Sequence, residues 1–347
     1  MRKTEGRGRE LLCKMIAACI FGCSGPHLTP EEAAFFREVQ PWGFILFGRN
    51  IQAPQQVRAL VADLRASVDR PDAPVLIDQE GGRVRRLRPP HWRGYPPARA
   101  YAGLDPELTW LGGRLVAHDL AGLGINVDCA PVLDVPVPGA HDIIGDRAYA
   151  DDPQQVARLA RAFAEGLIAG GVAPIVKHTP GHGRAGADSH LDLPVVDEAR
   201  AKLEAVDFRP FKALADLPMA MTAHVVYTAI DPLRPATTSP VVIEEIIRGV
   251  IGFDGLLISD DLSMKALSGD FTSRARDALS AGCDVVLHCN GDMDEMKAVA
   301  AGVRPLEGLA HRRAGAALAS VSAPPQPFDA GAAGLRFDAA FPQRVDA

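Results

Sequence analysis

The chain has 347 residues, 47% hydrophobic and 23% charged, a balance that is typical of a folded globular protein and excludes a disordered or fibrous one. Asp and Glu number 43 against 37 Lys and Arg, which gives a net charge of -6. Because no basic segment could neutralise several phosphates, we expect no nucleic acid among the partners of this protein.

The first predicted strand starts at Met15, in the apolar run MIAACIFGC. Basic residues before this run imitate a secretory signal peptide, but after the run Thr29 precedes Pro30 and two glutamates, the pattern of a capped helix start. We therefore interpret residues 15–23 as a buried strand that leads into a helix. No run approaches the roughly 18 apolar residues of a membrane span, so we expect a protein without a membrane partner.

Short apolar runs bounded by turn residues recur along the chain and alternate with segments of helical periodicity. The candidate strands start at Met15, Gly43, Ala73, Ile125, Ala173, Ala220, Gly255 and Asp284. The helical segments are Pro30–Val39, Ala53–Val68, Leu108–Gly124, Asp152–Gly171, Phe208–Leu217, Pro240–Gly252, Phe271–Gly282 and Asp294–Val303. The chain therefore consists of about eight β–α units in succession.

This alternation predicts an α/β fold, a single (β/α)8 TIM-type barrel, because strands that are covered by helices in a closed parallel sheet are continuously apolar. A doubly wound open sheet is the alternative, but the glycine-rich turns with which such sheets bind phosphates are missing. We predict that residues 1–321 form the catalytic barrel. Residues 322–347, rich in Pro, Gly and Ala, are predicted to form a tail that packs on the barrel or trails from it.

In such barrels the active site lies at the carboxyl ends of the strands. A single polar residue where a strand leaves the core is ordinary. Here, however, polar residues follow about five or six of the candidate strands, which predicts that they converge on one mouth. These residues are Asp78, Asp134, Lys177, His178, His224, Asp260, Asp261 and Asn290.

The segment Lys177–Pro194, KHTPGHGRAGADSHLDLP, follows a strand and contains three histidines. We expect no metal site, because its proline and glycines prevent the helix that would align His178 with His182, and the six cysteines include no C-x-x-C pair. A serine triad is also disfavoured, because neighbours in sequence cannot fold back into a relay. Ser189 is therefore interpreted as a spacer.

Asp188 and His190 lie two residues apart in this segment, so in an extended chain both side chains point to the same side. The carboxylate can then orient and polarise the imidazole. Because a histidine titrates near neutral pH and the glycines let the loop move, the pair is a candidate general acid/base. The alternative is an exposed loop histidine without a catalytic role.

The segment Gly252–Ala266 contains a buried strand that ends in two adjacent carboxylates, Asp260 and Asp261. Successive strand side chains point in opposite directions, so we expect only one of the two to face the barrel mouth. The other is expected to cap a helix, with Asp261 or Ser263 as the N-cap before LSMKAL. Asp260 is then the inward carboxylate and a candidate nucleophile, although periodicity alone leaves the two roles exchangeable.

The segment Ala73–Pro90 contains Asp78 at a strand end, a diglycine turn and four arginines, among them Arg86. A solvated loop is one interpretation of the arginines. The functional interpretation is sugar recognition, in which Asp78 accepts hydrogen bonds from ring hydroxyls and an arginine donates charge-assisted ones. These residue types together suit a polyhydroxylated substrate.

The blocks IDQEGGRVRR, KHTPGHGRAGADSH and ISDDLSM resemble, in order and spacing, the signature blocks of glycoside hydrolase family 3 in its β-N-acetylglucosaminidase branch. The resemblance runs from about Ile20 to about Leu318. It implies that Asp260 is the catalytic nucleophile, His190 the general acid/base and Asp188 its partner. The substrate contacts that it implies are Asp78, Arg86, Arg147, Lys177 and His178.

The resemblance implies a retaining exo-β-N-acetylglucosaminidase that removes a non-reducing terminal N-acetylglucosamine by double displacement, without a metal or organic cofactor. It further implies a cytoplasmic enzyme of peptidoglycan recycling that acts on N-acetylglucosaminyl-1,6-anhydromuramyl peptides, and we expect a monomer. Two departures from the family pattern stand out. Thr179 replaces a common aromatic residue, and the loop before Gly145 is longer, which leaves the pose of Arg147 open.

Three alternatives remain open from the sequence. Phosphate could capture the same covalent intermediate, because a histidine acid/base repels an anion less than a glutamate does. Asp78 and Glu80 form the D-x-E pattern of a substrate-assisted hexosaminidase, although the turn after them disfavours that mechanism. A sugar-binding barrel without catalysis is the non-enzymatic alternative.

Overall fold

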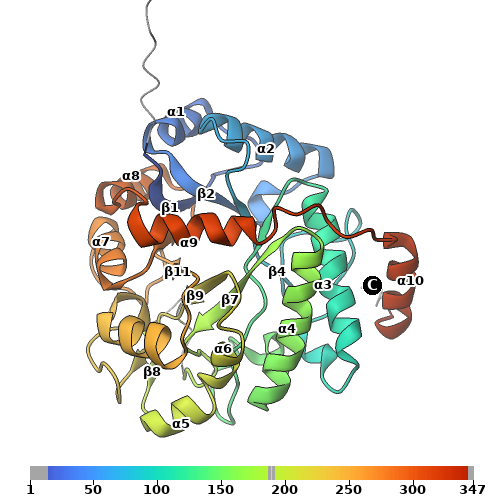
Figure 1. The fold of residues 1–347 in the computed structure, drawn as a ribbon. Coiled ribbons are helices and arrows are strands. Elements are labelled where there is room, and N and C mark those ends of the chain that lie inside the picture. The colour runs from blue at the N-terminus through green and yellow to red at the C-terminus, as the bar shows by residue number, and fades with distance from the viewer. Residues whose placement is uncertain (1–14, 187–188, 190–191, 343–347) are drawn as a thin grey trace, which may run out of the picture.

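The computed structural model describes residues 15–186, 189 and 192–342 (Figure 1). Parallel strands close a barrel, which confirms the predicted α/β fold. In order around the barrel they are β1 (Ala17–Gly22), β2 (Pro41–Leu46), β3 (Val75–Ile77), β6 (Val127–Asp128), β7 (Ala173–Thr179), β9 (Met219–Thr222), β11 (Leu256–Asp261) and β12 (Val285–His288). This order follows the chain, as expected for successive β–α units.

Helices surround the barrel, and each predicted helical segment contains one of them (Figure 1). The α-helices are α1 (Pro30–Val39), α2 (Pro54–Ser67), α3 (Pro106–Ala121), α4 (Pro153–Ala169), α5 (Arg200–Ala205), α6 (Arg209–Ala213), α7 (Phe271–Ala281), α8 (Met293–Gly302), α9 (Gly308–Ala319) and α10 (Ala330–Ala340). The segment before β11 is a π-helix, η5 (Val242–Val250). Apolar periodicity thus located the helices that alternate with the strands, because such helices bury one face on the sheet, whereas α5, α9 and α10 were not predicted.

The start of the chain confirms the interpretation of a buried strand leading into a capped helix. β1 is buried along most of its length, and α1 begins after Thr29. Thr29 Oγ1 accepts a hydrogen bond from the Glu32 backbone N–H at 3.2 Å, and Glu32 Oε2 accepts one from the Thr29 N–H at 2.9 Å. This reciprocal capping box satisfies two N–H groups that the first helical turn leaves free.

A short antiparallel hairpin directly follows β3 and lies outside the barrel. It consists of β4 (Gln79–Gly81) and β5 (Val84–Arg85). Gly81 has φ +100° and Gly82 φ +53°, and a Cβ at Gly81 would overlap the carbonyl oxygen of Pro96. The diglycine turn therefore needs glycine, and it folds the arginine-rich return strand back over the strand end. A second short sheet pairs β8 (Val195–Val196) with β10 (Val226–Tyr227).

The fourth barrel strand is shorter than its apolar run predicts. Only Val127 and Asp128 pair in the regular ladder, and the chain rejoins β7 further on through a bridge between Val132 and Lys177. Pro131 lies in the gap, and proline has no N–H to donate to a ladder. The irregular stretch still carries Asp134 to the carboxyl end of the barrel.

The helix that we expected after Asp261 does not form, so the prediction of an N-cap at Asp261 or Ser263 is wrong. The residues after β11 form turns, and α7 starts only at Phe271, with Asp270 as its N-cap. Asp261 instead accepts hydrogen bonds from the N–H groups of Ser263 and of Cys289 beyond β12, at 3.0 and 3.1 Å. A tertiary contact thus uses the carboxylate that sequence assigned to a cap.

The C-terminal helix α10 packs against α3, at the right of the barrel in Figure 1. Its Phe337 is fully buried against Tyr95 and Tyr101, and Asp338 forms an ion pair with Arg93. The predicted division of the chain at residue 321 stays a prediction.

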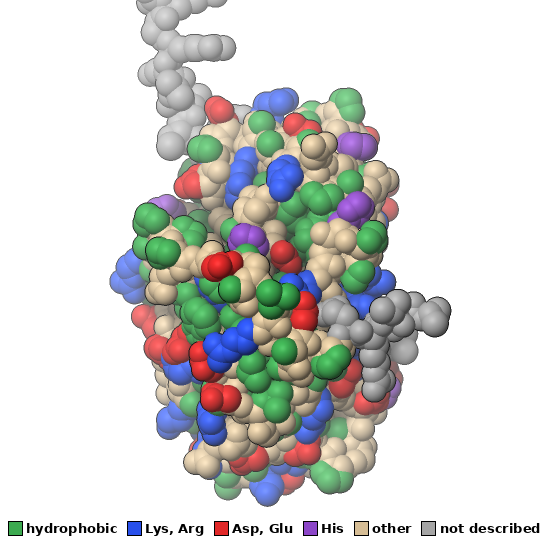
Figure 2. All heavy atoms as spheres, turned by 90° about the vertical axis from the view of Figure 1, so that its right-hand side faces the viewer, with side chains coloured by type: hydrophobic (Ala, Val, Ile, Leu, Met, Phe, Trp, Pro, Cys, Tyr) green, Lys and Arg blue, Asp and Glu red, His purple; other side chains and the backbone are tan. Residues whose placement is uncertain are grey.

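The surface of the described chain carries both signs of charge. On the face shown in Figure 2, Lys and Arg side chains are interspersed with Asp and Glu, and no extended basic patch is seen. Among the helices of the described residues, none has the length and hydrophobicity needed to cross a lipid bilayer.

Candidate active site

A cavity of about 350 Å³ opens at the carboxyl ends of the strands. It brings together residues that are far apart in sequence, as the barrel architecture requires. Six of the predicted site residues line it, namely Asp78, Arg86, Arg147, Lys177, His178 and Asp260. The remaining two, Asp188 and His190, lie outside the described residues.

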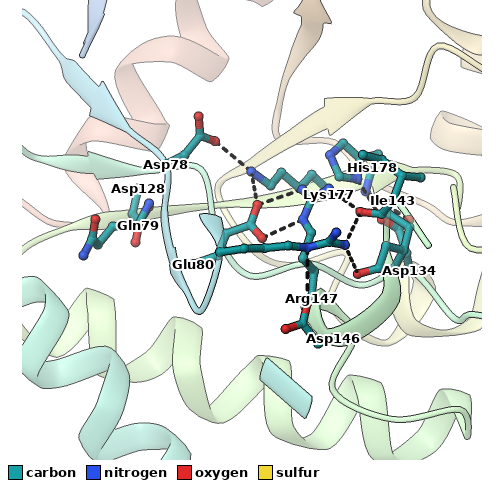
Figure 3. Close-up of polar contacts among 12 residues, drawn as sticks. Asp78, Gln79, Glu80, Asp128, Asp134, Ile143, Asp146, Arg147, Lys177 and His178 are labelled. Carbon is teal, nitrogen blue, oxygen red and sulfur yellow. Dashed lines mark hydrogen bonds and ion pairs between the residues drawn. The ribbon is translucent and has the colours of Figure 1, made fainter. Parts of the chain in front are cut away.

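Lys177 is the centre of a buried charge cluster in the cavity wall (Figure 3). It lies at the end of β7, and its side chain is only 3% exposed. Its Nζ lies 2.8 Å from Asp78 Oδ1 and 2.7 Å from Glu80 Oε1. Asp78 and Glu80 meet the same cation because they alternate along an extended segment and so share one face.

Two arginines complete the cluster. Arg86 donates to Asp78 Oδ2 at 2.9 Å, and Arg147 donates through Nε and NH2 to the two oxygens of Glu80, both at 2.9 Å. The longer loop before Gly145 therefore still delivers Arg147 to the cavity, in the fork geometry in which a guanidinium binds a carboxylate. Glu80 is a site residue that the sequence analysis missed, although its D-x-E spacing from Asp78 was visible.

The charges of this cluster hold one another ionised. Burial raises the pKa of Glu80, but Arg147 and Lys177 outweigh burial and lower it to about 2. Burial likewise raises the pKa of Asp78, but Lys177 and Arg86 outweigh burial and hold this pKa well below its usual range. Burial lowers the pKa of Lys177, and both carboxylates raise it above that of an exposed lysine. At neutral pH the wall is thus a set of fixed ion pairs.

Gln79, which lies between Asp78 and Glu80 in the sequence and is buried, holds the hairpin in shape. Its backbone N–H donates to Asp128 Oδ1 at 2.9 Å, and its Oε1 accepts from the N–H groups of Arg86 and Leu87 at 2.9 and 3.0 Å. The Arg86 guanidinium also lies over the ring of Phe47, 4.9 Å from its centroid. Arg86 is therefore fixed at both its backbone and its head group.

His178 forms a second wall of the cavity with Asp134 behind it. The His178 Nδ1 lies 2.7 Å from Asp134 Oδ2. Asp134 Oδ1 accepts from the backbone N–H of His182 at 2.6 Å and from that of His178 at 3.3 Å. Burial raises the pKa of Asp134, but His178 and His182 outweigh it and hold the pKa below its usual value. Asp134, predicted at the mouth, is fully buried and does not line the cavity.

Asp260 stands at the end of β11 on the opposite side of the cavity. Its Oδ1 accepts from the Asp261 N–H at 2.8 Å, and its own N–H donates to Thr222 Oγ1 at 3.3 Å. Burial raises the pKa of this carboxyl, but His224 and His178 outweigh burial and keep the pKa below its usual value. Asp260 is therefore ionised at neutral pH.

The expectation that only one of the two adjacent carboxylates faces the mouth is wrong, because Asp260 and Asp261 both line the cavity. The pairing of β11 with β12 shifts register between Ile258 and Asp261, and such an irregularity breaks strict alternation. The two residues still differ in use. Asp261 binds the Ser263 hydroxyl at 2.5 Å in addition to two backbone N–H groups, so its carboxylate is fully engaged.

Two further predicted residues, His224 and Asn290, are not among the residues that line the cavity. His224 Nε2 contacts the Asp261 carbonyl oxygen at 3.0 Å, and its Nδ1 lies 2.7 Å from Thr237 Oγ1. Asn290 hydrogen-bonds the Ser263 hydroxyl at 3.2 Å. Ser189, interpreted as a spacer, is buried and lines the cavity, with its Oγ 3.3 Å from His182 Nε2. Within the described residues, no cluster of three or more His, Cys, Asp or Glu has a metal-binding arrangement.

Residues 17–322 match the sequence profile of the glycosyl hydrolase family 3 N terminal domain. The chain belongs to glycoside hydrolase family 3. This confirms the predicted family and the prediction of a glycoside hydrolase. The chain is 42% identical to a beta-hexosaminidase of Alkalilimnicola ehrlichii over 286 residues, which cover 80% of this chain and 81% of the relative. It is 41% identical to one of Pseudomonas aeruginosa over 293 residues, 83% of this chain and 86% of the relative.

Solved structures of the same family share the fold. NagZ of Neisseria gonorrhoeae, in complex with N-trifluoroacetyl-D-glucosamine, aligns with a TM-score of 0.83 and 32% identity, covering 94% of this chain and 98% of that one. A family 3 β-N-acetylglucosaminidase of a Paenibacillus species aligns with a TM-score of 0.82 and 31% identity, covering 93% of this chain and 66% of that one.

Proposed function

We propose that this protein is a retaining exo-β-N-acetylglucosaminidase. The observation that carries the proposal is a contrast within one cavity. The charges of Asp78, Glu80, Lys177 and the two arginines are paired, whereas the carboxylate of Asp260 has no ion-pair partner among the described residues and accepts a single hydrogen bond from them. Paired charged side chains that line the cavity can hydrogen-bond a polyhydroxylated ring, and an unpaired carboxylate can attack its anomeric carbon. The similarity to beta-hexosaminidases supports N-acetylglucosamine as the sugar.

Asp260 acts as the nucleophile in this proposal. Its Oδ1 is held by the Asp261 N–H, which leaves Oδ2 to attack the anomeric carbon. His190, oriented by Asp188, protonates the leaving oxygen as the C–O bond breaks, and a glycosyl ester of Asp260 forms. His190 then removes a proton from the water that cleaves this ester, which releases the sugar with its original anomeric configuration.

The charge cluster and His178 hold the sugar ring. Asp78 accepts hydrogen bonds from ring hydroxyls, while Arg86, Arg147 and Lys177 donate them, and none of these groups has to reorganise because neighbours already fix them. The charges that stay fixed on binding favour a neutral sugar in this subsite. No step requires a metal or an organic cofactor.

The natural substrate that we propose is an N-acetylglucosaminyl-1,6-anhydromuramyl peptide of peptidoglycan recycling, cleaved in the cytoplasm. The NagZ similarity over almost the full length of both chains supports this substrate class. We further propose that the enzyme acts as a monomer.

Substrate selectivity and covalent trapping test the proposal together. The enzyme is expected to release 4-nitrophenol from 4-nitrophenyl β-N-acetylglucosaminide, and to release it at most slowly from 4-nitrophenyl β-glucoside. Phosphate should leave this rate unchanged. NMR of the released sugar should show that the anomeric configuration is retained. A 5-fluoro N-acetylglucosaminyl fluoride should label Asp260, located by mass spectrometry of the peptides. Inversion of configuration, or labelling of another residue, would refute the mechanism. Sugar 1-phosphate as the product would instead identify a phosphorylase.

A further inference from the structure

Asp134 is a fully buried carboxylate for which the mechanism above has no use. It lies on the irregular stretch after β6, and both of its oxygens face nitrogen atoms. Its Oδ2 faces His178 Nδ1 at 2.7 Å, while its Oδ1 faces the backbone N–H groups of His182 and His178 at 2.6 and 3.3 Å. A buried ionised group is retained at a cost, so its contacts indicate a purpose.

The Asp134 carboxylate determines where the ring proton of His178 lies. An ionised carboxylate cannot donate, so the hydrogen bond at 2.7 Å requires a proton on His178 Nδ1. In the neutral ring Nε2 then carries a lone pair and is an acceptor. His178 lines the cavity, and its Nε2 has no hydrogen bond to any described residue.

The other groups of the cavity make an acceptor at this point useful. Lys177, Arg86 and Arg147 bring only donors to the wall, and the oxygens of Asp78 and Glu80, its other acceptors, also accept from these cations. A sugar hydroxyl that approaches His178 therefore finds a free lone pair. Each hydroxyl both donates and accepts, so a wall with both kinds of partner satisfies it fully.

We propose that Asp134 is a positioning residue that locks His178 in the Nδ1–H tautomer, so that His178 Nε2 accepts a hydrogen bond from one ring hydroxyl of the bound N-acetylglucosamine. The site thereby requires a hydrogen-bond donor at that ring position. This inference rests on the proposed function, because it concerns the sugar in the same subsite. A site built around a hydroxyl donor rejects analogues that lack the proton, since its own polar group is then left unpaired.

Asp134→Asn is a sharp test because the surrounding backbone decides how the amide is oriented. The asparagine oxygen must take the Oδ1 position, where it accepts from the N–H groups of His182 and His178. Its NH2 group then takes the Oδ2 position and donates to His178 Nδ1. The ring proton moves to Nε2, which becomes a donor. The substitution reverses the polarity of His178 toward the substrate without changing its shape.

The assay compares 4-nitrophenyl β-N-acetylglucosaminides in which the 3-, 4- or 6-hydroxyl is replaced by hydrogen or by fluorine. Fluorine accepts a hydrogen bond weakly and donates none. In the wild type, removing the hydroxyl that faces His178 should lower kcat/KM about tenfold or more. In His178→Ala the same removal should have little effect, which identifies the ring position. Fluorine also changes the reactivity of the sugar inductively. The ratio of kcat/KM for the fluoro analogue to that for the deoxy analogue in His178→Ala measures this effect and serves as the baseline.

At that position we expect the fluoro to deoxy ratio of the wild type to lie below the His178→Ala baseline, because the Nε2 lone pair repels fluorine. In Asp134→Asn the ratio should rise about three- to tenfold above the baseline, because Nε2–H now donates to fluorine. Asp128→Asn is the matched control. It makes the same substitution at another buried aspartate, which contacts Gln79 and has no hydrogen bond to His178, and its ratio should equal that of the wild type.

A second readout does not depend on turnover. In protein with 15N-labelled histidine, the His178 signals, assigned by their absence in His178→Ala, should show a protonated Nδ1 in the wild type and a protonated Nε2 in Asp134→Asn. A wild-type ratio above the baseline, or the same tautomer in both proteins, would overturn the inference. Failure of the wild type to hydrolyse the parent N-acetylglucosaminide would refute the proposed function instead, and the NMR spectrum would still decide the tautomer.

Discussion

The two sides of the cavity treat charge in opposite ways. On one side, Asp78 and Glu80 share Lys177, and each also binds its own arginine. On the other side, Asp260 receives one backbone N–H and forms no ion pair with a described residue. The difference separates two tasks. A wall that binds must keep its shape, so its charges neutralise one another, whereas a group that forms a bond must keep an oxygen free.

The supports behind the two sides differ in the same way. Gln79 and Asp128 hold the hairpin behind the paired side through buried hydrogen bonds. Behind Asp260, Thr222 and His224 make their hydrogen bonds to the backbone of the strand end and none to the Asp260 carboxylate. Each side can therefore be perturbed separately, and the effects should fall on different quantities.

The largest effect is expected when the charge of Asp260 is removed. Asp260→Asn should lower kcat/KM by roughly 10³-fold or more, because the amide cannot form the covalent intermediate. Asp261→Asn is the matched control, since this neighbour binds backbone N–H groups and a hydroxyl. It should keep most of the activity and lose about 1 kcal/mol in the free energy of unfolding. Equal activity losses in both variants would mean that the two carboxylates share the chemistry.

Removing the central cation should mainly cost stability. Lys177→Met leaves two buried carboxylates with one arginine each, so we expect the free energy of unfolding to fall by about 3 kcal/mol in urea titrations. Lys297→Met is the control, because Lys297 forms an exposed ion pair, in which its Nζ lies 3.4 Å from Glu31 Oε1. Its cost should stay below about 0.5 kcal/mol. A wild-type stability for Lys177→Met would show that the arginines alone neutralise the cluster.

The pH dependence of stability should reveal Asp128. Burial raises the pKa of this carboxyl to about 8, while an unfolded aspartate titrates near its ordinary value of about 3.9. Between these two values the folded state binds one proton more than the unfolded state. Stability therefore falls by about 1.4 kcal/mol per pH unit as pH rises through this window. Urea unfolding at several pH values measures this effect. Relative to Asp128→Asn, the wild type should lose about 1.4 kcal/mol in the free energy of unfolding per pH unit. The same pH dependence of the free energy of unfolding in both proteins would contradict the prediction.

The smallest effect is expected behind Asp260. Thr222→Val removes the hydroxyl that accepts from the Asp260 N–H at 3.3 Å and that contacts Thr237 at 2.7 Å. Because a buried N–H is left unpaired, the free energy of unfolding should fall by about 1–2 kcal/mol. Thr222→Ser, which keeps the hydroxyl, should recover the hydrogen bonds. Thermal unfolding of both variants measures the difference, and equal melting temperatures would count against this contact.

Sequence reasoning found much of the site because strand ends are local features. Asp78, Lys177, His178 and Asp260 all follow apolar runs, and the barrel carries each run to the same mouth. It missed Glu80, which enters the cavity only because the diglycine turn folds the hairpin over the strand end. The pose of Arg147 was beyond reach, since it meets Glu80 across a separation of 67 residues.

The error at Asp261 shows how a tertiary contact overrides a local preference. A local rule assigned this residue to a helix cap. In the folded protein a register shift between β11 and β12 turns Asp261 toward the cavity, where it binds the Cys289 N–H. Local preference yields where a partner from a distant segment offers a better hydrogen bond.

By itself the amino-acid sequence determined that this chain forms a barrel of alternating strands and helices, because hydrophobic periodicity is a property of neighbouring residues. It also determined which strand ends are polar. Only the tertiary structure decided which charges pair, as when Lys177 meets Asp78 across 99 residues, and which carboxylate stays free. Those outcomes depend on the paths of loops and on small shifts of strand register, and a change of a few ångströms is enough to break or form an ion pair.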